Sequence, residues 1–289
     1  MNTNTGFIGS TDDYGAAKTV LFGAPFDSTT SGRPGARFGP GAIRAESHGL
    51  ETYSPYQDKD LDDLAFFDAG DLELPFGDSA GALAMIEEQA AAILDAGKLP
   101  FLLGGEHLVT LGAVRAAAAR YPDLHLIHFD AHADLREDYL GVKLSHACVI
   151  RRCWEILGDG RIAQFGIRSG TREEFAWAAG GRTALHKFGF EGFTDGLSAL
   201  MESLAARNVP VYFSVDIDVL DPSILPGTGT PEAGGVSSFA ELLCAMLYVF
   251  RANVVACDLV ELAPGLDASG VSAATAAKLV REMLLAIGN

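Results

Sequence analysis

The sequence predicts an α/β fold built on a largely parallel β-sheet, and two observations lead to this prediction. Short apolar runs alternate with longer segments typical of helices along nearly all of the 289 residues. Three of the apolar runs end in acidic residues or histidine, as expected where parallel strands open onto a ligand-binding edge. A closed eight-stranded barrel would give a similar string, so the pattern alone leaves the topology open between a barrel and an open sheet.

Eight strands are expected, over residues 19–26, 64–69, 99–103, 124–130, 162–167, 183–188, 209–217 and 253–261. Helices are expected between most of them, over residues 78–96, 107–119, 145–157, 171–179, 196–207, 238–251 and 272–287. Asp78 is a suitable N-cap for the first of these helices, and Gly97 is a suitable stop. Two long loops, 27–41 and 219–237, are expected to be functional because loops of this length in compact domains usually are. With no linker or repeat between these elements, residues 1–289 are predicted to form a single domain.

Composition excludes several classes of protein. The chain is 48% hydrophobic, yet no apolar run approaches the roughly 20 residues that a membrane span needs, so no membrane association is expected. Residues 1–14 are polar and acidic, unlike a signal peptide. The four cysteines form no CxxC pair, which indicates reduced thiols in a cytoplasmic enzyme.

The formal charge of −17 argues against a nucleic-acid partner, because binding phosphates requires patches of Lys and Arg. The same charge favours a small cationic substrate, which the field of the protein would attract. Ordinary solubility explains the charge equally well.

The first ionisable cluster, Asp130, His132 and Asp134, follows the apolar run 124–129. Side chains at alternate positions of an extended backbone point to one side, so these three are expected to converge. Two carboxylates about 4 Å apart repel by roughly 4 kcal/mol at an effective dielectric constant near 20. A metal ion between them would remove that cost.

Two further strands supply similar groups at their ends. The run 211–215 leads into Asp216 and Asp218, and the run 99–103 leads through Gly104-Gly105-Glu106 to His107. The resulting set of two imidazoles and four carboxylates is large enough for two divalent cations bridged by aspartates. Because the set contains no thiolate, it suits Mn²⁺ or a similar hard ion.

These motifs resemble a known family. Residues 104–107, Asp130-Ala-His-Ala-Asp134 and residues 214–222 look like the three metal motifs of the ureohydrolase (arginase/agmatinase) family. The similarity begins at residues 23–27 and the loop 33–40 and continues to residues 258–264, so it covers nearly the whole chain. It implies a three-layer α/β/α sandwich with an eight-stranded parallel sheet, and two Mn²⁺ ions per chain.

The resemblance also implies the role of each ligand. His107 and Asp134 would bind one ion and His132 and Asp218 the other, with both bridged by Asp130 and Asp216.

Two more positions match the family. Glu261 resembles the acid that binds the substrate guanidinium, and His146 resembles the active-site histidine that shuttles protons. The family more often has Gly after this histidine, where Ala147 stands here. Glu106 is expected to support the first ligand, and His128 is expected to have a core or sheet role.

The stretch 134–146 resembles bacterial agmatinases, whereas arginases have Asn at the position of Arg136. Hydrolysis of agmatine to putrescine and urea is therefore the predicted activity. Guanidinobutyrase is the second choice, because Arg136 could contact a substrate carboxylate, and arginase is the third. From other classes, a single-zinc deacetylase of the same fold lacks its paired catalytic histidines here, and a non-catalytic binding protein would be expected to have lost ligands. The family often forms trimers or hexamers, so a homo-oligomer is expected.

Overall fold

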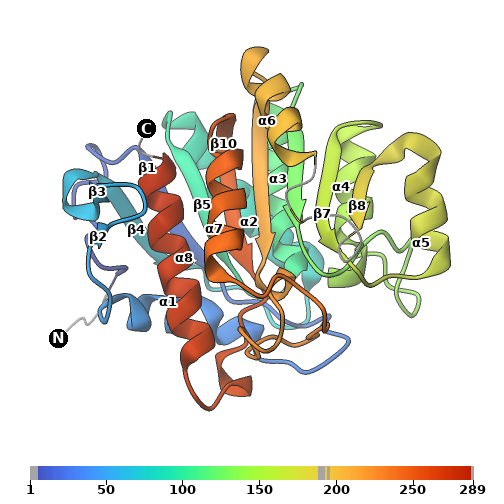
Figure 1. The fold of residues 1–289 in the computed structure, drawn as a ribbon, viewed down its shortest axis with the longest axis horizontal. Helices are drawn as coiled ribbons and strands as arrows, with labels where there is room; N and C mark the ends of the chain where they lie inside the picture. The colour runs from blue at the N-terminus through green and yellow to red at the C-terminus, as the bar shows by residue number, and fades with distance from the viewer. Residues whose placement is uncertain (1–5, 188–192, 194–195, 288–289) are drawn as a thin grey trace.

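Eight parallel strands form one open sheet in the computed structural model, which describes residues 6–187, 193 and 196–287 (Figure 1). Their order across the sheet is β4-β1-β5-β10-β9-β6-β7-β8. The strands are β1 (Thr19–Ala24), β4 (Phe66–Asp71), β5 (Leu99–Gly104), β6 (His125–Phe129), β7 (Ile162–Ile167), β8 (Ala184–Lys187), β9 (Pro210–Asp216) and β10 (Asn253–Val260). Because β4 and β8 lie at opposite edges, the sheet does not close into a barrel.

Helices cover both faces of this sheet. One face carries α2 (Ser79–Asp95), α3 (Thr110–Arg120), α4 (Val149–Leu157) and α5 (Arg172–Trp177). The other carries α1 (Gly39–Ser47), α6 (Leu197–Ala206), α7 (Phe239–Val249) and α8 (Val271–Ile287). Successive strand residues face opposite sides, so Phe213 packs under one helix layer and Tyr212 under the other. The predicted three-layer α/β/α sandwich is confirmed.

The expected strands and helices are all found, with boundaries shifted by a few residues. Asp78 caps α2 by accepting a hydrogen bond from the Gly81 N–H, and Gly97 follows the helix with a φ of 71°. The helix α1 was not predicted and begins inside the expected loop 27–41, with Pro40 in its first turn. A small hairpin of β2 (Tyr53–Ser54) and β3 (Lys59–Asp60) was also missed. Phe188, the last residue of one expected strand, lies outside the described residues.

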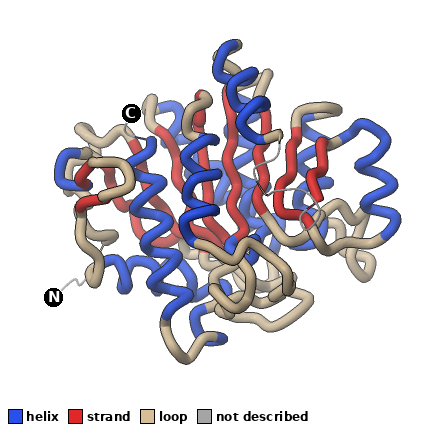
Figure 2. The backbone as a smooth tube through the Cα atoms, in the orientation of Figure 1, coloured by secondary structure: helices blue, strands red, loops and turns tan. Residues whose placement is uncertain are grey.

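The connections place four strand ends together. After β5 the chain passes to β6, and the later strands β9 and β10 fill the space between these two. The carboxyl ends of β5, β10, β9 and β6 are therefore neighbours, at the point in an α/β sheet where ligands bind. Figure 2 shows the long loops gathered at this end of the sheet. Within the described part of the chain, every helix is too short or too polar to cross a membrane.

Candidate metal centre

The predicted ligands converge at this edge of the sheet. His107, which follows β5, directs its Nδ1 atom at three carboxylates. The Nδ1 atom lies 3.1 Å from an oxygen of Asp130, 3.2 Å from one of Asp216 and 3.4 Å from one of Asp134. The side chain of His107 is only 1% exposed, so these groups meet in the protein interior.

The remaining two ligands lie on the other side of Asp130. The Nδ1 atom of His132 is 3.1 Å from Asp218 Oδ2 and 3.4 Å from Asp130 Oδ1. Asp130 thus turns one oxygen towards His132 and the other towards His107, the arrangement expected of a bridging carboxylate. The His132 side chain is 24% exposed, so this side of the cluster is closer to solvent.

The local backbone brings the ligands together in a way that differs from the prediction. The strand β6 ends at Phe129, so Asp130, His132 and Asp134 lie in the loop after it; His132 still bridges to Ser169 as in a parallel sheet, whereas Asp134 departs from extended backbone with a φ of 51°. The loop is instead fixed by its own hydrogen bonds, since the N–H of His132 donates to Asp130 Oδ1. Asp218 likewise lies in a 3₁₀ turn after β9, where its N–H donates to Asp216 Oδ1.

Two of the predicted site residues have strained backbones. Asp134 and Glu261 adopt left-handed conformations, with φ of 51° and 67°. Each such conformation costs on the order of 1–3 kcal/mol in a residue with a side chain, and such residues cluster at functional sites.

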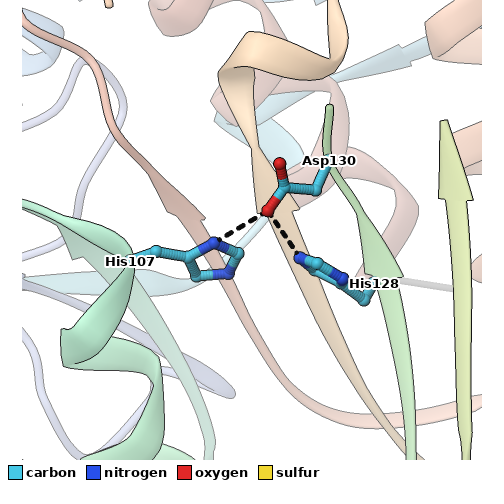
Figure 3. Close-up of side chains that lie close together, drawn as sticks. All are labelled: His107, His128 and Asp130. Carbon is cyan, nitrogen blue, oxygen red and sulfur yellow. Dashed lines mark hydrogen bonds and ion pairs between the residues drawn. The ribbon is translucent and has the colours of Figure 1, made fainter. Parts of the chain in front are cut away.

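His128 lies beside the cluster, with its ring directed at Asp130, and is fully buried (Figure 3). The Gln164 amide nitrogen, which also donates to the Ala133 carbonyl, lies 3.1 Å from His128 Nδ1. Nδ1 is therefore the acceptor, and Nε2 donates to Asp130 Oδ2 at 2.8 Å. Because Nδ1 accepts a hydrogen bond, the ring is neutral, and burial lowers the pKa of His128 in the same sense. Both ring nitrogens form hydrogen bonds within the protein, so His128 orients Asp130 and does not bind a metal ion itself. A core or sheet role was expected for His128 from the sequence, and its contact with Asp130 was not predicted.

The donor set fits divalent cations. Burial, together with the neighbouring carboxylates of Asp218 and Asp130, raises the pKa of Asp216 well above its usual range. In the described part of the chain, the buried Nδ1 atom of His107 has no hydrogen bond of good geometry, although three carboxylate oxygens lie within 3.4 Å of it. Two imidazole nitrogens and four carboxylates without a thiol form a hard ligand set, and cations would offset the repulsion among the carboxylates.

A cavity of about 220 Å³ opens beside the cluster. His146 lies on its wall, and Ser31 fixes the orientation of the ring. The Ser31 N–H donates to His146 Nε2 at 3.1 Å, so Nδ1 is the protonated nitrogen of the neutral ring. Burial lowers the pKa of His146 to about 4. The cavity is lined by Ser31, His132, Ala133, Asp134, Arg136, Tyr139, His146, Ala147, Ser169, Gly170, Thr171, Glu174, Asp216 and Thr230.

Glu261 follows β10 and lies between the cluster and His146. Its Oε1 atom is 3.8 Å from His146 Nδ1 and accepts the His107 N–H at 2.7 Å. The carboxylate is 2% exposed and is not part of the cavity wall, and burial raises its pKa. The contact with the His107 backbone was not foreseen from the sequence, because the two residues are far apart in the chain.

The loop that follows β1 supports His146. Glu106 accepts hydrogen bonds from the Thr29 N–H at 2.9 Å and from the Thr29 hydroxyl at 2.6 Å. The Thr29 oxygen in turn accepts the His146 N–H at 3.0 Å. Glu106 therefore fixes the loop that positions His146, and so contacts the site indirectly. This role differs from the prediction, in which Glu106 supported His107.

Arg168 is a further residue that the sequence did not indicate. Its guanidinium donates to the backbone carbonyls of Asp218, Val219 and Leu220. These bonds hold the turn that carries Asp218 and the start of the long loop 219–237. A signal for this role is hard to find in sequence, because the partners are backbone atoms.

A larger cavity of about 550 Å³ lies at the opposite ends of the strands, where β1, β4 and β5 begin. It contains none of the predicted site residues. The smaller cavity is therefore the candidate site, because the ionisable residues converge there.

Comparison with known proteins supports this assignment. The sequence model of the Arginase family matches residues 17–286. A protein of Bacillus subtilis named agmatinase is 50% identical over 281 residues, covering 96% of this chain and 95% of the relative. An agmatinase of Bacillus cereus is 49% identical with the same coverage. The crystal structure of the agmatine ureohydrolase of Thermoplasma volcanium superposes with a TM-score of 0.88 at 35% identity, covering 98% of this chain and 94% of that chain. This chain belongs to the arginase family of ureohydrolases.

Proposed function

We propose that this protein is an agmatinase, which hydrolyses agmatine to putrescine and urea and so serves polyamine biosynthesis. The observation that carries the proposal is the convergence of two imidazoles and four carboxylates beside a narrow cavity walled by His146. The identity of 50% to an agmatinase over nearly the whole chain supports agmatine as the substrate. The acidic character of the chain is compatible with a substrate that is cationic at both ends.

Two Mn²⁺ ions are proposed as the cofactor. One ion would be held by His107 and Asp134, the other by His132 and Asp218, and both by Asp130 and Asp216. Divalent ions bound in this way supply a water that is deprotonated near neutral pH and can act as a nucleophile. Manganese is preferred over softer metals because the ligands are carboxylates and imidazoles.

Two side chains are proposed to act directly on the substrate. Glu261 is buried behind the cavity wall beside His146, so the guanidinium would have to pass this wall to reach a carboxylate that matches its planar fork of N–H donors. Hydrolysis forms a bond from the water oxygen to the guanidinium carbon and breaks the bond to the nitrogen that carries the alkyl chain. The leaving amine needs a proton, and His146 would relay it: the neutral ring would take up a proton at Nε2, which lies 2.9 Å from the Ser31 hydroxyl, as it gives up the proton on Nδ1.

The outer end of the cavity bears on the choice of substrate. Arg136 lies there, with its guanidinium over the Tyr139 ring and its Nε atom 3.8 Å from Glu174. Glu174 offers negative charge to the distal ammonium of agmatine, whereas Arg136 offers positive charge to a carboxylate. The presence of Arg136 keeps hydrolysis of 4-guanidinobutyrate as the second candidate.

An assay of urea release tests the proposal. Purified protein supplied with Mn²⁺ is given agmatine, arginine, 4-guanidinobutyrate and 3-guanidinopropionate separately, and metal content is measured on the same sample. We expect kcat/KM for agmatine to exceed the others by at least about 10-fold, with about two Mn²⁺ per chain. A preference for 4-guanidinobutyrate would favour the second candidate. One Zn²⁺ per chain without urea release would instead indicate a deacetylase.

We further propose that residues 1–289 act as a single domain in a cytoplasmic homo-oligomer, a trimer or hexamer. The four cysteines are free, as expected in a reducing compartment. The large apolar side chains Phe38 and Phe76 are 65% and 88% exposed and line the same surface cavity, and exposed apolar surface of this kind can mark a subunit contact. Light scattering after size-exclusion chromatography tests the assembly, and a monomeric mass would exclude it.

A further inference from the structure

A series of buried hydrogen bonds leads away from the metal cluster through His107, Ser214 and Asp258. The His107 Nε2 atom lies 3.0 Å from the Ser214 hydroxyl, and Ser214 donates to Asp258 Oδ1 at 2.7 Å. All three residues are fully buried. Ser214 on β9 and Asp258 on β10 are paired in register, so the sheet itself fixes their separation.

Among the described residues, the hydrogen bonds to the carboxylate at the end of this series, Asp258, all come from hydroxyl groups. Besides Ser214, Asp258 accepts the Thr110 hydroxyl at 2.8 Å and the Tyr212 hydroxyl at 2.7 Å. Burying a carboxylate is costly unless hydrogen bonds compensate, and three of them are provided here. The arrangement therefore holds the Ser214 proton on the side of Asp258.

The direction of these bonds determines where His107 carries its proton. A hydroxyl has one proton, and that of Ser214 is used by Asp258, so the oxygen can only accept from His107. His107 Nε2 must therefore carry a hydrogen whether or not Nδ1 is also protonated before an ion binds. The Nδ1 atom is left to face Asp130, Asp134 and Asp216.

We infer that Ser214 and Asp258 form a positioning pair that fixes the tautomer and ring orientation of His107, so that Nδ1 is presented to a divalent cation. Neither residue touches the cavity or the proposed substrate. Outer hydrogen-bond partners of this kind typically change metal affinity by about 10- to 100-fold. The inference rests on the proposed metal cluster and is independent of which guanidino compound is hydrolysed.

A pair of variants tests the inference through metal binding. Ser214→Ala removes the acceptor of the His107 proton. The matched control Tyr212→Phe removes a hydroxyl from the same carboxylate but leaves the Ser214–His107 contact intact. We expect Ser214→Ala to weaken the tighter Mn²⁺ step in calorimetric titration by about 10- to 100-fold, and Tyr212→Phe to change it by less than about threefold. Equal affinities in the two variants would overturn the inference.

A second measurement needs no variant, so it holds even if Ser214→Ala fails to fold. Wild-type protein labelled with ¹⁵N at histidine and loaded with diamagnetic Zn²⁺ should show His107 protonated at Nε2 and metal-bound at Nδ1. A proton on Nδ1 in this sample would overturn the inference. If the wild type binds no divalent ion at all, both this inference and the proposed function fail; if it binds ions but Ser214→Ala binds them equally well, only the positioning role fails.

Discussion

The two halves of the metal cluster are built differently. The inner half, His107 and Asp134, has a buried imidazole, because the His107 side chain is 1% exposed and is held through both Ser214 and Glu261. The outer half, His132 and Asp218, has an equally buried carboxylate but a more open imidazole, because the His132 side chain is 24% exposed. The comparison indicates that the inner half is pre-organised by tertiary structure, whereas the outer half is the more open to exchange.

The outer half depends on a clamp of a different kind. The loop 219–237 begins just after Asp218, and Arg168 fixes this junction by binding backbone carbonyls. Asp221 closes the base of the same loop by accepting the N–H groups of Gly234 and Gly235. Loops generally open more easily than core strands, so the strength of metal binding should differ between the halves.

The largest loss of metal and activity is expected at the two aspartates proposed to bind both ions. Asp130→Asn or Asp216→Asn should lose at least one metal ion and nearly all activity, because each residue is proposed to hold both ions. Metal analysis and urea release on the same preparation check this. Full metal content with normal turnover would contradict the bridging assignment.

A smaller effect is expected on the wall of the cavity. His146→Ala should lower kcat by about 10²- to 10⁴-fold, the usual contribution of a positioned acid or base, with metal content unchanged in both halves. Steady-state kinetics between pH 6 and 9, combined with metal analysis, provide the measurement. Retention of the wild-type kcat throughout this range would show that the imidazole has only a structural role.

A still smaller effect is expected beside the inner half. Glu261→Gln keeps an oxygen that can accept the His107 N–H but loses the charge that pairs with the guanidinium. The loss of a charged hydrogen bond costs roughly 1.5–3 kcal/mol, or about 10- to 150-fold in kcat/KM. Kinetics on agmatine test this, with unchanged Mn²⁺ content as the control. A variant within twofold of the wild type would mean that another residue binds the guanidinium.

Removal of metal tests directly whether the two halves of the cluster hold their ions differently. During dialysis against a chelator, one ion should leave at least about 10-fold faster than the other, because the inner imidazole has buried hydrogen-bond support. Metal content followed over time should therefore fall in two phases. The Arg168→Lys variant should accelerate the fast phase alone, since the compact ammonium of lysine lacks the planar fork with which the guanidinium reaches the carbonyls of Asp218, Val219 and Leu220. A single phase would indicate that the halves are equivalent.

The smallest effect concerns pH and the loop of the outer half. Hydrogen bonds from Ser223 and from the Gly234 and Gly235 amides lower the pKa of Asp221 to about 2. Because the folded-state pKa lies below the ordinary value of 3.8, the stability that these bonds contribute is present above that value and is lost as pH falls towards 2.

The variant Asp221→Asn measures this contribution. The difference in stability between wild type and variant should be constant from pH 5 to 7 and should shrink below about pH 4. Denaturant unfolding at a series of pH values checks this. A difference that does not change with pH would show that the ionised carboxylate is not responsible.

Much of the fold could be predicted from local pattern. Most strands of the large sheet are short apolar runs, whereas β4 and β8 are more polar, and α2 is bounded by the capping side chain of Asp78 and by Gly97, which has a positive φ. The missed helix α1 lies in a stretch rich in Gly and Pro, residues that usually mark loops, and packing against α8 stabilises it. The choice between a barrel and an open sheet could not be made from pattern, because both alternate strands and helices.

The sequence by itself determined which groups could bind metal, because the order of residues places carboxylates and imidazoles directly after the apolar strands. Only the tertiary structure decided their arrangement. The sheet order placed β9 and β10 between β5 and β6, which brought Glu261 against His107. The protonation pattern of His107 follows from contacts with Ser214 and Asp258, residues more than a hundred positions away. Hydrogen bonds over such sequence distances have no local signature, because they depend on how strands pair and not on what their neighbours in the chain are.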